Sequence, residues 1–578
     1  MSLIGALNNT FAGLKDTEAR LNVTSQNVTN ADKAGYTRKV YNSEYSTTDF
    51  STIPSGGTID AAFSDPYLQK AMIEDTSDAG KHTTVATYLE EYANNLGKIS
   101  SQSTISSAID GIAAALDGLS VTPEDDSLKV QVVNEAERVA YELTSLSDNI
   151  QDLRARADQE IGNIVDEINA SLQRLDEINV QITLTGSTGR SVAELEDQRR
   201  TELEKLAENM DINYFVDNNN QVNIYSGGRP LLDSAVHQLD YTAASNVAGS
   251  TLYPAGFSPI DLNGTDITTL IKGGELAGLI DVRDSYLVEE QEKLDEFATA
   301  LMDTMNALLN EGAPYSARTE IVGDEIGFAA ADPLGGTGFV RIAMTDTTGT
   351  VQSFTDFDLT AYATVNDMIN AINVAFGGDI TASLDVDGRL NLVSNVATQG
   401  ISLNQLDSDI GGESFSMAFG LNGMFDGDGA EDITVSSYLL ANATHLATSR
   451  LSSDPALIVG DVGISPGDGS LSKELNEALS STLSFNAAGN FSAQSETLDR
   501  YIDKLISNIA VRASNAADAA ETSTLVLEQT KTTFQNLTGV NVDEEMTNLI
   551  DLEAKYAASA RMMSTIQQMF DELINAVR

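Results

Sequence analysis

Apolar residues recur at both ends of the chain in alternating steps of three and four positions. This spacing aligns side chains along one helical seam, a pattern typical of coiled coils. Threonine dilutes the N-terminal seam, so that helix needs a partner in water, and the C-terminal seam is a candidate. The simpler alternative is that two amphipathic ends dock separately on a globular body. The N-terminal seam contains Leu3, Leu7, Thr10, Leu14, Thr17, Leu21, Thr24 and Val28, and the C-terminal seam contains Leu549, Leu552, Tyr556, Ser559, Met563, Ile566, Phe570, Leu573 and Val577.

Helical spacing also marks long internal stretches. The longest extends from Val130 to about Leu184 without proline, which favours a bundle or rod over a small globular domain. A helix after residue 190 has Ser191 at its expected N-cap and Glu194 three residues later, the arrangement of a capping box. Further helices are predicted over residues 85–119, 275–311 and 495–537.

Two internal regions change to the alternating pattern of strands. Residues 212–270 contain the short runs "INYFV" and "QVNIY" between Asn and Gly turns. Residues 315–435 are rich in Gly and Thr and contain "ITASLDVDGRLNLVS", with one helix near "VNDMINAINVAF". The chain therefore nests, with terminal helices outermost and β-rich segments at its centre.

The fold class predicted from these patterns is a multidomain α+β protein. Terminal helices form a coiled coil, long helices form a rod domain, and β-rich domains are inserted. The expected boundaries are 1–40 and 540–578 for the terminal domain; 41–210, 271–314 and 436–539 for the helical rod; 211–270 for a small β region; and 315–435 for a β-rich outer domain.

The charge balance restricts the function. The 578 residues contain 33 Lys and Arg against 86 Asp and Glu, a net charge of −53. That field repels polyanions, so general binding to nucleic acid is excluded. Residues 1–40 carry a net +2, residues 540–578 a net −4 and the remainder −51. The two ends are thus weakly complementary, and the repulsive charge lies between them.

The chain has no cysteine, which excludes disulfides, a thiol nucleophile and cysteine-ligated zinc. No apolar run approaches the roughly 20 residues that span a bilayer, so no membrane association is expected. The first 20 residues are amphipathic and do not resemble a cleaved signal peptide. By this criterion alone the protein would be cytoplasmic, unless its export needs no cleaved signal.

Catalytic and metal-binding patterns are weak. The three histidines, His82, His237 and His445, are isolated, and no HExxH motif is present. "DTSDAGKHT" (75–83) is not a phosphate-binding loop, because it lacks the leading glycine and has His82 instead of Ser or Thr directly after Gly-Lys. "MFDGDGAED" (424–432) concentrates acids that could bind calcium, but it lacks EF-hand spacing, so a solvated acidic loop is preferred. We expect no cofactor and no enzymatic activity.

The segment "NVTSQNVTNADKAGYTR" (22–38) is polar although it follows a helical seam. With the residues around it, it resembles the N-terminal signature of the axial proteins of the bacterial flagellum, the rod, hook and hook-associated proteins. Residues 539–577 resemble their C-terminal signature. "ELEDQRRTELEKLAENMDINYFV" and the segment from "GGELAGLIDVRDSYL" to "NALLNEG" resemble the helical region of the hook-associated proteins of the hook–filament junction. "ATVNDMINAINVAFGGDITASLDVDGRLNLVS" resembles a β-domain motif of flagellins and their relatives.

The resemblance implies a structural adaptor that joins hook to filament as a ring of subunits. Its terminal helices would form the wall of a hollow tube, and its β domains would face solvent. Implied partners are other copies of the chain, the hook protein, the adjoining hook-associated protein and an export chaperone at the C-terminal helix. Secretion by the flagellar type III route would place it in the extracellular flagellum.

The polar segment would end the N-terminal helix between Asn30 and Gly35, and its side-chain amides would contact neighbouring subunits. An ordinary Asn-rich helix end is the simpler interpretation. The expected assembly interface is Leu3, Leu7, Leu14, Leu21, Asn27, Asn30, Gly35, Tyr36, Leu549, Leu552, Tyr556, Met563, Ile566, Phe570 and Leu573.

Two alternatives stay open. The chain could be another axial protein, a hook or flagellin-like subunit, although the long helix at 130–184 argues against the hook protein. It could also be a secreted enzyme on a flagellin-type scaffold. That alternative requires a metal or nucleophile site within 315–435, and the sequence there shows none.

Overall fold

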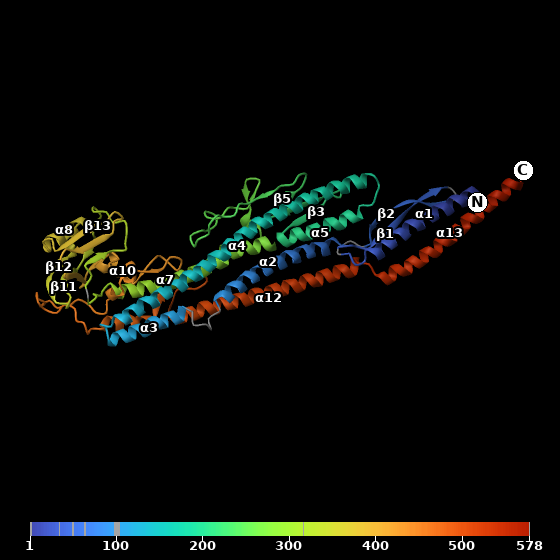
Figure 1. Cartoon of the computed structure of the whole chain (residues 1–578). Coiled ribbons are helices and arrows are strands. Elements are labelled where there is room, and N and C mark those ends of the chain that lie inside the picture. Colours follow the sequence, from blue (N-terminus) through green and yellow to red (C-terminus); the bar gives the residue numbers. More distant parts are fainter. Residues whose placement is uncertain are drawn as a thin grey trace. The chain divides into compact units, whose positions relative to one another are not determined.

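The computed structural model describes residues 3–33, 35–48, 51–62, 65–96, 105–315 and 317–576. The chain divides into two compact units. The first consists of Met1–Glu90, Arg154–Asp284 and Arg512–Arg578, and the second of Glu91–Leu153 and Ser285–Val511. Long helices alternate with small antiparallel sheets (Figure 1), which confirms the multidomain α+β class.

The first unit contains both ends of the chain. Its helices are α1 (Leu3–Thr29), most of α2 (Pro66–Leu96), the end of α4 (Asp126–Ser187), α5 (Ala193–Asn209), η1 (Thr268–Leu270), α6 (Gly274–Asp281), the end of α12 (Leu498–Thr538) and α13 (Val542–Ala576). Its strands are β1 (Lys39–Thr48), β2 (Ser51–Ala61), β3 (Asn213–Val216), β4 (Val222–Ser226), β5 (Arg229–Leu232), β6 (Leu239–Asp240), β7 (Asp261–Leu262) and β8 (Thr265–Asp266).

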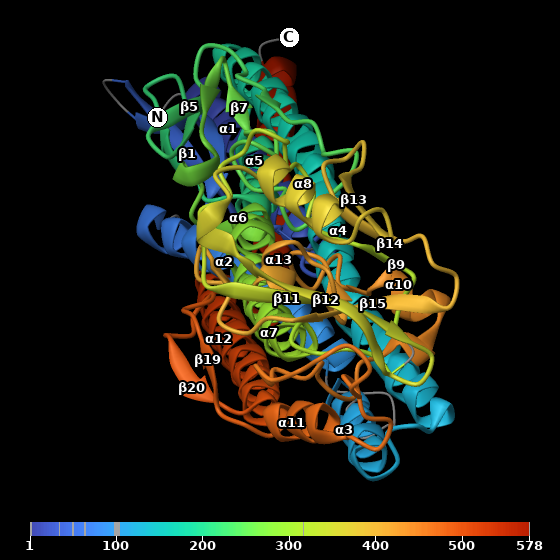
Figure 2. The same ribbon diagram turned by 90° about the vertical axis from the view of Figure 1, so that its left-hand side faces the viewer.

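The second unit joins helices to the β-rich insertion. Its further helices are α3 (Ile105–Val121), α7 (Leu287–Leu309), η3 (Leu359–Ala361), α8 (Val365–Ala375), α9 (Phe415–Ala418), α10 (Ser437–Ala441), η4 (Ala443–His445) and α11 (Ser470–Leu479). Figure 2 shows α11 beside α3. The strands are β9 (Glu320–Val322), β10 (Gly336–Thr337), β11 (Phe339–Asp346), β12 (Val351–Asp358), β13 (Ile380–Leu384), β14 (Leu390–Ser394), β15 (Gln399–Asn404), β16 (Asp409–Ile410), β17 (Phe425–Asp426), β18 (Thr434–Val435), β19 (Leu483–Phe485) and β20 (Gln494–Glu496).

Helix α4 forms because its apolar positions share one face. At 62 residues it is about 93 Å long at 1.5 Å per residue. It begins four residues before the predicted start and ends three residues after the predicted end. Its inward face has side chains at most 2% exposed: Leu143, Ile150, Leu153, Ala157, Ile161, Ile168, Leu172, Leu175 and Ile182.

The β-rich insertion has its own apolar core. The sheets β12-β11-β15 and β13-β14-β9 enclose buried side chains, and α8 packs against β13. Thr364 and Asp367 form a capping box at the start of α8. Alternating burial along β13 and β14 reproduces the alternation in the sequence.

Three local features differ from the expectations. Residues 39–48 and 51–61 form the antiparallel strand pair β1–β2, although they lie almost entirely within a segment assigned to the helical rod. The predicted 275–311 helix is interrupted by the π-helical turn η2 (Val282–Tyr286). Helix α5 has Val192 at its N-cap instead of Ser191. The Ser191 hydroxyl donates to the Ile59 carbonyl oxygen at 2.7 Å and therefore serves the hairpin as well.

No described helix combines the length and the apolar character needed to cross a bilayer.

Candidate assembly interface

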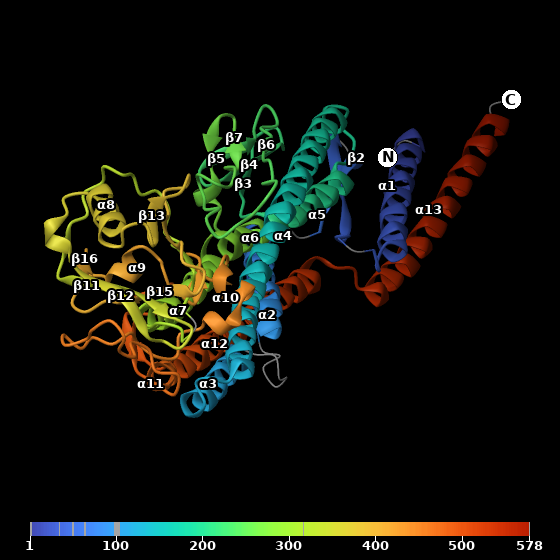
Figure 3. The same cartoon turned by 60° about the vertical axis from the view of Figure 1, so that its left-hand side comes forward.

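Helices α1 and α13 pack against each other, as the two terminal seams predict (Figure 3). The threonines of α1 bond within their own helix, because the Thr10 and Thr17 hydroxyls each donate to a carbonyl oxygen four residues earlier at 2.8 Å. The pair thus joins the two ends of the sequence in the first unit.

Within one chain this pairing covers only part of the predicted seams. Ile566 is buried, whereas Tyr556 and Leu573 are 38% and 59% exposed. Val577 lies outside the described residues. Half-buried seam residues are Leu3, Leu7, Leu14, Leu21, Leu549, Leu552, Met563 and Phe570. The two helices therefore keep apolar surface that their own chain does not cover.

Further apolar side chains on these helices lie outside the predicted seams and face solvent. They are Ile4, Phe11, Met546, Ile550, Met562, Met569 and Ile574, with exposures between 43% and 64%. So many exposed large apolar side chains on one helix pair favour a site of protein–protein contact.

The polar segment 22–38 holds a second feature, which we call the polar joint: Asn27, Tyr36, Thr37, Arg38, Lys39, Asp197 and Glu545. Helix α1 ends at Thr29 and the chain turns through Gly35, whose φ of +76° favours glycine. A side chain at Gly35 would also meet the Thr201 hydroxyl at 2.7 Å. The Arg200 guanidinium donates to the Gly35 carbonyl oxygen. The predicted helix stop is therefore correct, and the segment returns toward α5.

Asn27 lies at the centre of the joint and is 1% exposed. Its amide nitrogen donates to the Lys39 carbonyl oxygen at 2.9 Å and to Glu545 Oε2 at 3.0 Å. Its amide oxygen accepts from the Lys39 backbone N–H at 3.0 Å and from the Tyr36 hydroxyl at 2.9 Å. These four bonds exhaust the amide. They leave nothing with which Asn27 could contact a neighbouring subunit, the role expected for it.

Asn30 lies beyond the joint. Its amide nitrogen donates to the Gln26 carbonyl oxygen at 2.9 Å, a local bond at the helix end. For Asn30 the simpler interpretation, an Asn-rich helix end, describes this contact.

Arg38 and Glu545 tie the start of the chain to its last helix. The Arg38 Nε and Nη2 atoms donate to Glu545 Oε1 at 2.9 and 2.7 Å, and the Glu545 side chain is 2% exposed. The Arg38 backbone N–H donates to the Thr538 carbonyl oxygen at 2.7 Å, at the end of α12. A carboxylate this deeply buried is stable only with such charge-assisted bonds. The contact therefore fixes the chain at the break between α12 and α13.

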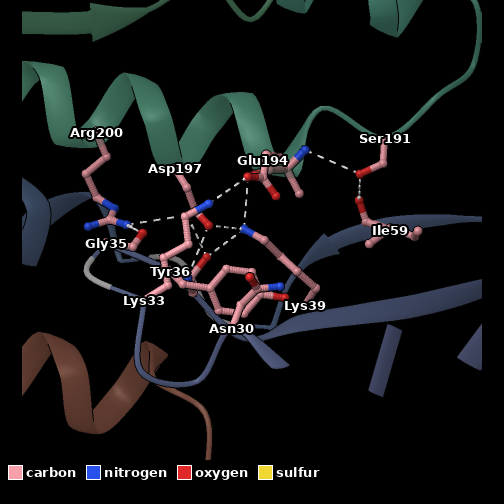
Figure 4. Close-up of polar contacts among 12 residues, drawn as sticks. Asn30, Lys33, Gly35, Tyr36, Lys39, Ile59, Ser191, Glu194, Asp197 and Arg200 are labelled. Atoms are coloured by element: carbon pink, nitrogen blue, oxygen red, sulfur yellow. Dashed lines mark hydrogen bonds and ion pairs between the residues drawn. The ribbon is translucent and has the colours of Figure 1, made fainter. Parts of the chain in front are cut away.

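Lys39 and Asp197 anchor the same segment to α5 (Figure 4). The Lys39 ammonium donates to Asp197 Oδ2 at 2.6 Å and to the Ala193 carbonyl oxygen at 2.9 Å. The Thr37 hydroxyl donates to Asp197 Oδ1 at 2.7 Å. At the edge, exposed Lys33 pairs with Glu194 at 3.1 Å. Each buried charge thus has an opposite charge and further hydrogen bonds.

Tyr36 stays neutral within this arrangement. Burial and the nearby Asp197 and Glu194 carboxylates raise the pKa of Tyr36 to about 12. Its hydroxyl therefore keeps its proton and donates to Asn27. The groups of the joint satisfy one another and thereby hold α1, α5 and α13 together.

Comparisons with known proteins agree with the terminal signatures. The family model "Flagellar hook-associated protein FlgK helical domain" matches residues 89–320. "Flagellar basal body rod FlgEFG protein C-terminal" matches residues 532–576, and "Flagellin hook IN motif" matches residues 341–396.

Curated relatives extend the similarity over almost the whole chain. Flagellar hook-associated protein 1 of Salmonella typhimurium is 24% identical over 98% of this chain and 99% of the relative. The proteins of that name from Escherichia coli and Bacillus subtilis are 23% and 21% identical, over 98% and 99% of this chain and 99% of each relative.

Over almost its whole length, the chain is similar to the flagellar hook-associated protein 1 proteins. A solved structure, "the flagellar hook junction protein FlgK from Burkholderia pseudomallei", shares the fold. It covers 81% of this chain and 100% of its own length with a TM-score of 0.51 and 15% identity. The names of these relatives and the matched family models make the chain a structural component of the bacterial flagellum. The family predicted by resemblance is confirmed.

The rod-protein model matched at residues 532–576 begins just before the end of α12 and covers α13. It therefore includes Glu545, which sequence reasoning did not single out. For Glu545, the sequence offered one signal, the weak charge complementarity of the +2 and −4 ends. That signal indicated that the ends pair, but it did not show which residues meet. Asp197 could not be found from the sequence, because nothing there relates it to Lys39.

In the acidic stretch 424–432, the calcium candidate, carboxylates already accept hydrogen bonds from groups of the protein itself. Asp432 Oδ1 accepts from the Asp428 and Gly429 backbone N–H groups at 2.9 and 3.0 Å. The Ser436 hydroxyl donates to Asp426 at 2.7 Å. Within the described residues, no group of three or more His, Asp or Glu side chains has the arrangement of a metal site.

Proposed function

We propose that the chain joins hook to filament as one subunit of a ring in a hollow filament. The observation that carries this proposal is the α1–α13 pair. The pair is fixed to its own chain through Glu545 and Asp197, yet it keeps exposed apolar side chains such as Phe11, Ile550 and Met562. Neighbouring copies that covered these side chains would gain roughly 25 cal/mol for each Å² of apolar surface removed from water.

The proposed partners follow from this role. The hook protein lies on one side of the ring and the adjoining hook-associated protein on the other. An export chaperone holds the C-terminal helix before secretion by the flagellar type III route, and it shields the exposed apolar residues of α13. The role requires no cofactor, nucleic acid, membrane or catalytic activity. The name of the Burkholderia pseudomallei relative, a hook junction protein, supports the same assignment.

Deletion of the gene followed by electron microscopy tests the proposal. Cells without the protein should have hooks but no filaments, and a plasmid copy should restore the filaments. Filaments of normal length on the deleted strain would refute a junction role.

A point variant tests the buried seam more specifically. Phe570→Asp places a charge in the half-buried part of α13, where an unpaired buried charge is destabilising. Secretion should persist and filament growth should fail. The matched control is Val386→Asp, because Val386 is fully exposed in the turn between β13 and β14. Normal swimming of the Phe570→Asp strain would show that this part of α13 is not covered in the flagellum.

A further inference from the structure

The first unit contains an open groove of about 690 Å³ beside the polar joint. Two of the groups along it are exposed aromatics, Tyr67 at 86% and Phe215 at 52%, and next to Phe215 is Val216 at 45%. Phe215 and Val216 lie on β3, an edge strand of the β3-β4-β5 sheet. Large side chains exposed together beside a cavity favour a protein contact at this place.

The charge around the groove differs from that of the chain. Its lining contains four basic and three acidic residues, a net +1, whereas the whole chain carries −53. Lys39 and Arg200 already pair with Asp197 inside the joint. Lys70 is exposed at the rim. Lys70 is therefore a basic side chain that an acidic surface of another molecule could meet, in a lining whose net charge is not negative.

The second half of α12 carries a surface of the opposite kind. Leu525 and Val526 are 57% and 45% exposed. Asp518, Glu521 and Glu528 are exposed around them, one to two turns along the helix. Counted at about 100° per residue, Asp518, Glu521 and Glu528 lie within roughly 60° of Leu525. Asp518, Glu521 and Glu528 therefore form an acidic face around the exposed Leu525, and Val526 lies beside this face, about 100° from Leu525.

The groove and the acidic face are on different sides of α12. Phe534 lines the groove and is 5% exposed. It follows Leu525 by nine residues, which places it about half a turn away around the helix. One copy cannot bring its own acidic face into its own groove without unwinding α12. A second copy can.

We propose that the acidic face of α12 of one copy docks in the groove of the next copy. This inference rests on the proposed function and names one contact between ring neighbours. The contact is heterologous, since two different surfaces meet, and such contacts propagate into rings or helical assemblies instead of stopping at a dimer. Leu525 would cover Phe215 and Tyr67, and the three carboxylates would lie near Lys70.

The chain has no cysteine, so an introduced cysteine is the one thiol of this protein that a cross-linker can modify. Three variants are expressed in place of the native gene: Phe215→Cys, Leu525→Cys and the double variant carrying both. Flagella are isolated and treated with a short bis-maleimide. The double variant should give a ladder of dimers and higher multimers of this chain. Each single variant should stay monomeric, because a heterologous contact never brings the same residue of two copies together.

A control and a second measurement complete the test. Val386→Cys combined with Leu525→Cys should give no ladder, although Val386 is fully exposed and Phe215 only 52% exposed, because Val386 lies outside the groove. Lys70→Glu should reduce the number of filaments about fivefold, the effect of losing and reversing an exposed ion pair. Reversal of one of the three acids, Asp518→Lys, Glu521→Lys or Glu528→Lys, should restore it. These charge variants keep the test valid even if Phe215→Cys does not assemble.

The outcomes separate this contact from the junction role. A double variant that builds filaments but gives no ladder overturns the groove contact and leaves the proposed function intact. Multimers from Phe215→Cys alone, or a product with a different flagellar protein, also overturn it. A deleted strain that still grows filaments refutes the proposed function itself, whatever the cross-links show.

Discussion

The second half of α4 and the helix α13 carry similar sequence patterns in different surroundings. Both have apolar residues in steps of three and four. In α4, Ile161, Ile168 and Leu172 are fully buried within the chain, whereas α13 has Leu573 59% exposed and Ile566 alone buried among its seam residues. The same pattern therefore specifies a finished core in one helix and an uncovered interface in the other, and only the neighbours distinguish them.

Truncation of matched side chains should separate the two helices most strongly. Leu172→Ala removes a fully buried side chain and should lower the free energy of unfolding by about 2–5 kcal/mol. Ile550→Ala removes a side chain that is 64% exposed and should change it by less than about 0.5 kcal/mol. Filament assembly should respond in the opposite order. For each kcal/mol of stability lost, Ile550→Ala should reduce the number of filaments more than Leu172→Ala does. Urea unfolding of the purified chain and electron microscopy of flagella measure the two effects.

Equal losses of stability at both positions would contradict the comparison, since they would mean that α13 is already covered in the isolated chain.

The attachment of α13 should respond next. Glu545→Gln removes the charge that faces Arg38 at 2.7 Å, and breaking a buried pair destabilises by several kcal/mol when nothing replaces it. Because the Arg38 side chain is 29% exposed and can reach water, about 1–3 kcal/mol is expected. Limited proteolysis should then trim both ends, about 40 residues each, faster than in the native chain.

Glu544→Gln is the matched control, because Glu544 is 58% exposed and contacts the same guanidinium at 3.3 Å. It should leave the trimming rate nearly unchanged. Identical rates for the two variants would show that burial of Glu545 does not hold the ends in place.

Periodicity alone predicted much of this architecture. The spacing of apolar residues within each segment was enough to predict three features. They are the long helix α4, the β-rich insertion and the pairing of the chain ends. The joint did not follow, because Arg38 and Glu545 are 507 positions apart and only the fold brings them together. Nor did the hairpin β1–β2, whose strands are polar and were assigned to the rod by default. Ser191 lies one residue before the N-cap of α5; its hydroxyl donates to the Ile59 carbonyl oxygen of β2 and accepts from the Ala193 backbone N–H at 3.3 Å.

The β-rich insertion should respond to pH in a way that the terminal joint does not. Burial and the neighbouring Asp426 carboxylate raise the pKa of Asp324 to about 7, against the opposing charges of Arg318 and Arg389. The folded state therefore holds a proton that the unfolded state releases near pH 4. This contribution to stability is present at low pH and is lost as pH rises from about 4 to about 7.

Asp324→Asn should remove that pH dependence, because the amide imitates the protonated acid. The measurement is hydrogen exchange of peptides from 318–326 and 424–438, corrected for intrinsic rates, between pH 5 and 8. An unchanged pH profile in the variant would mean that other carboxylates, such as Glu325, determine the response.

The smallest effect concerns salt and the charge between the two ends. Residues 41–539 carry a net −51, so copies placed side by side repel one another. Added salt shortens the Debye length from roughly 30 Å at 0.01 M to about 8 Å at 0.15 M, while apolar contacts between terminal helices are not screened. Purified chain should therefore occupy isolated hook ends poorly at low ionic strength and better as salt rises, as counted by electron microscopy. Occupancy that fell steadily with salt would mean that attraction between oppositely charged surfaces, including that between Lys70 and the acidic face of α12, outweighs the general repulsion.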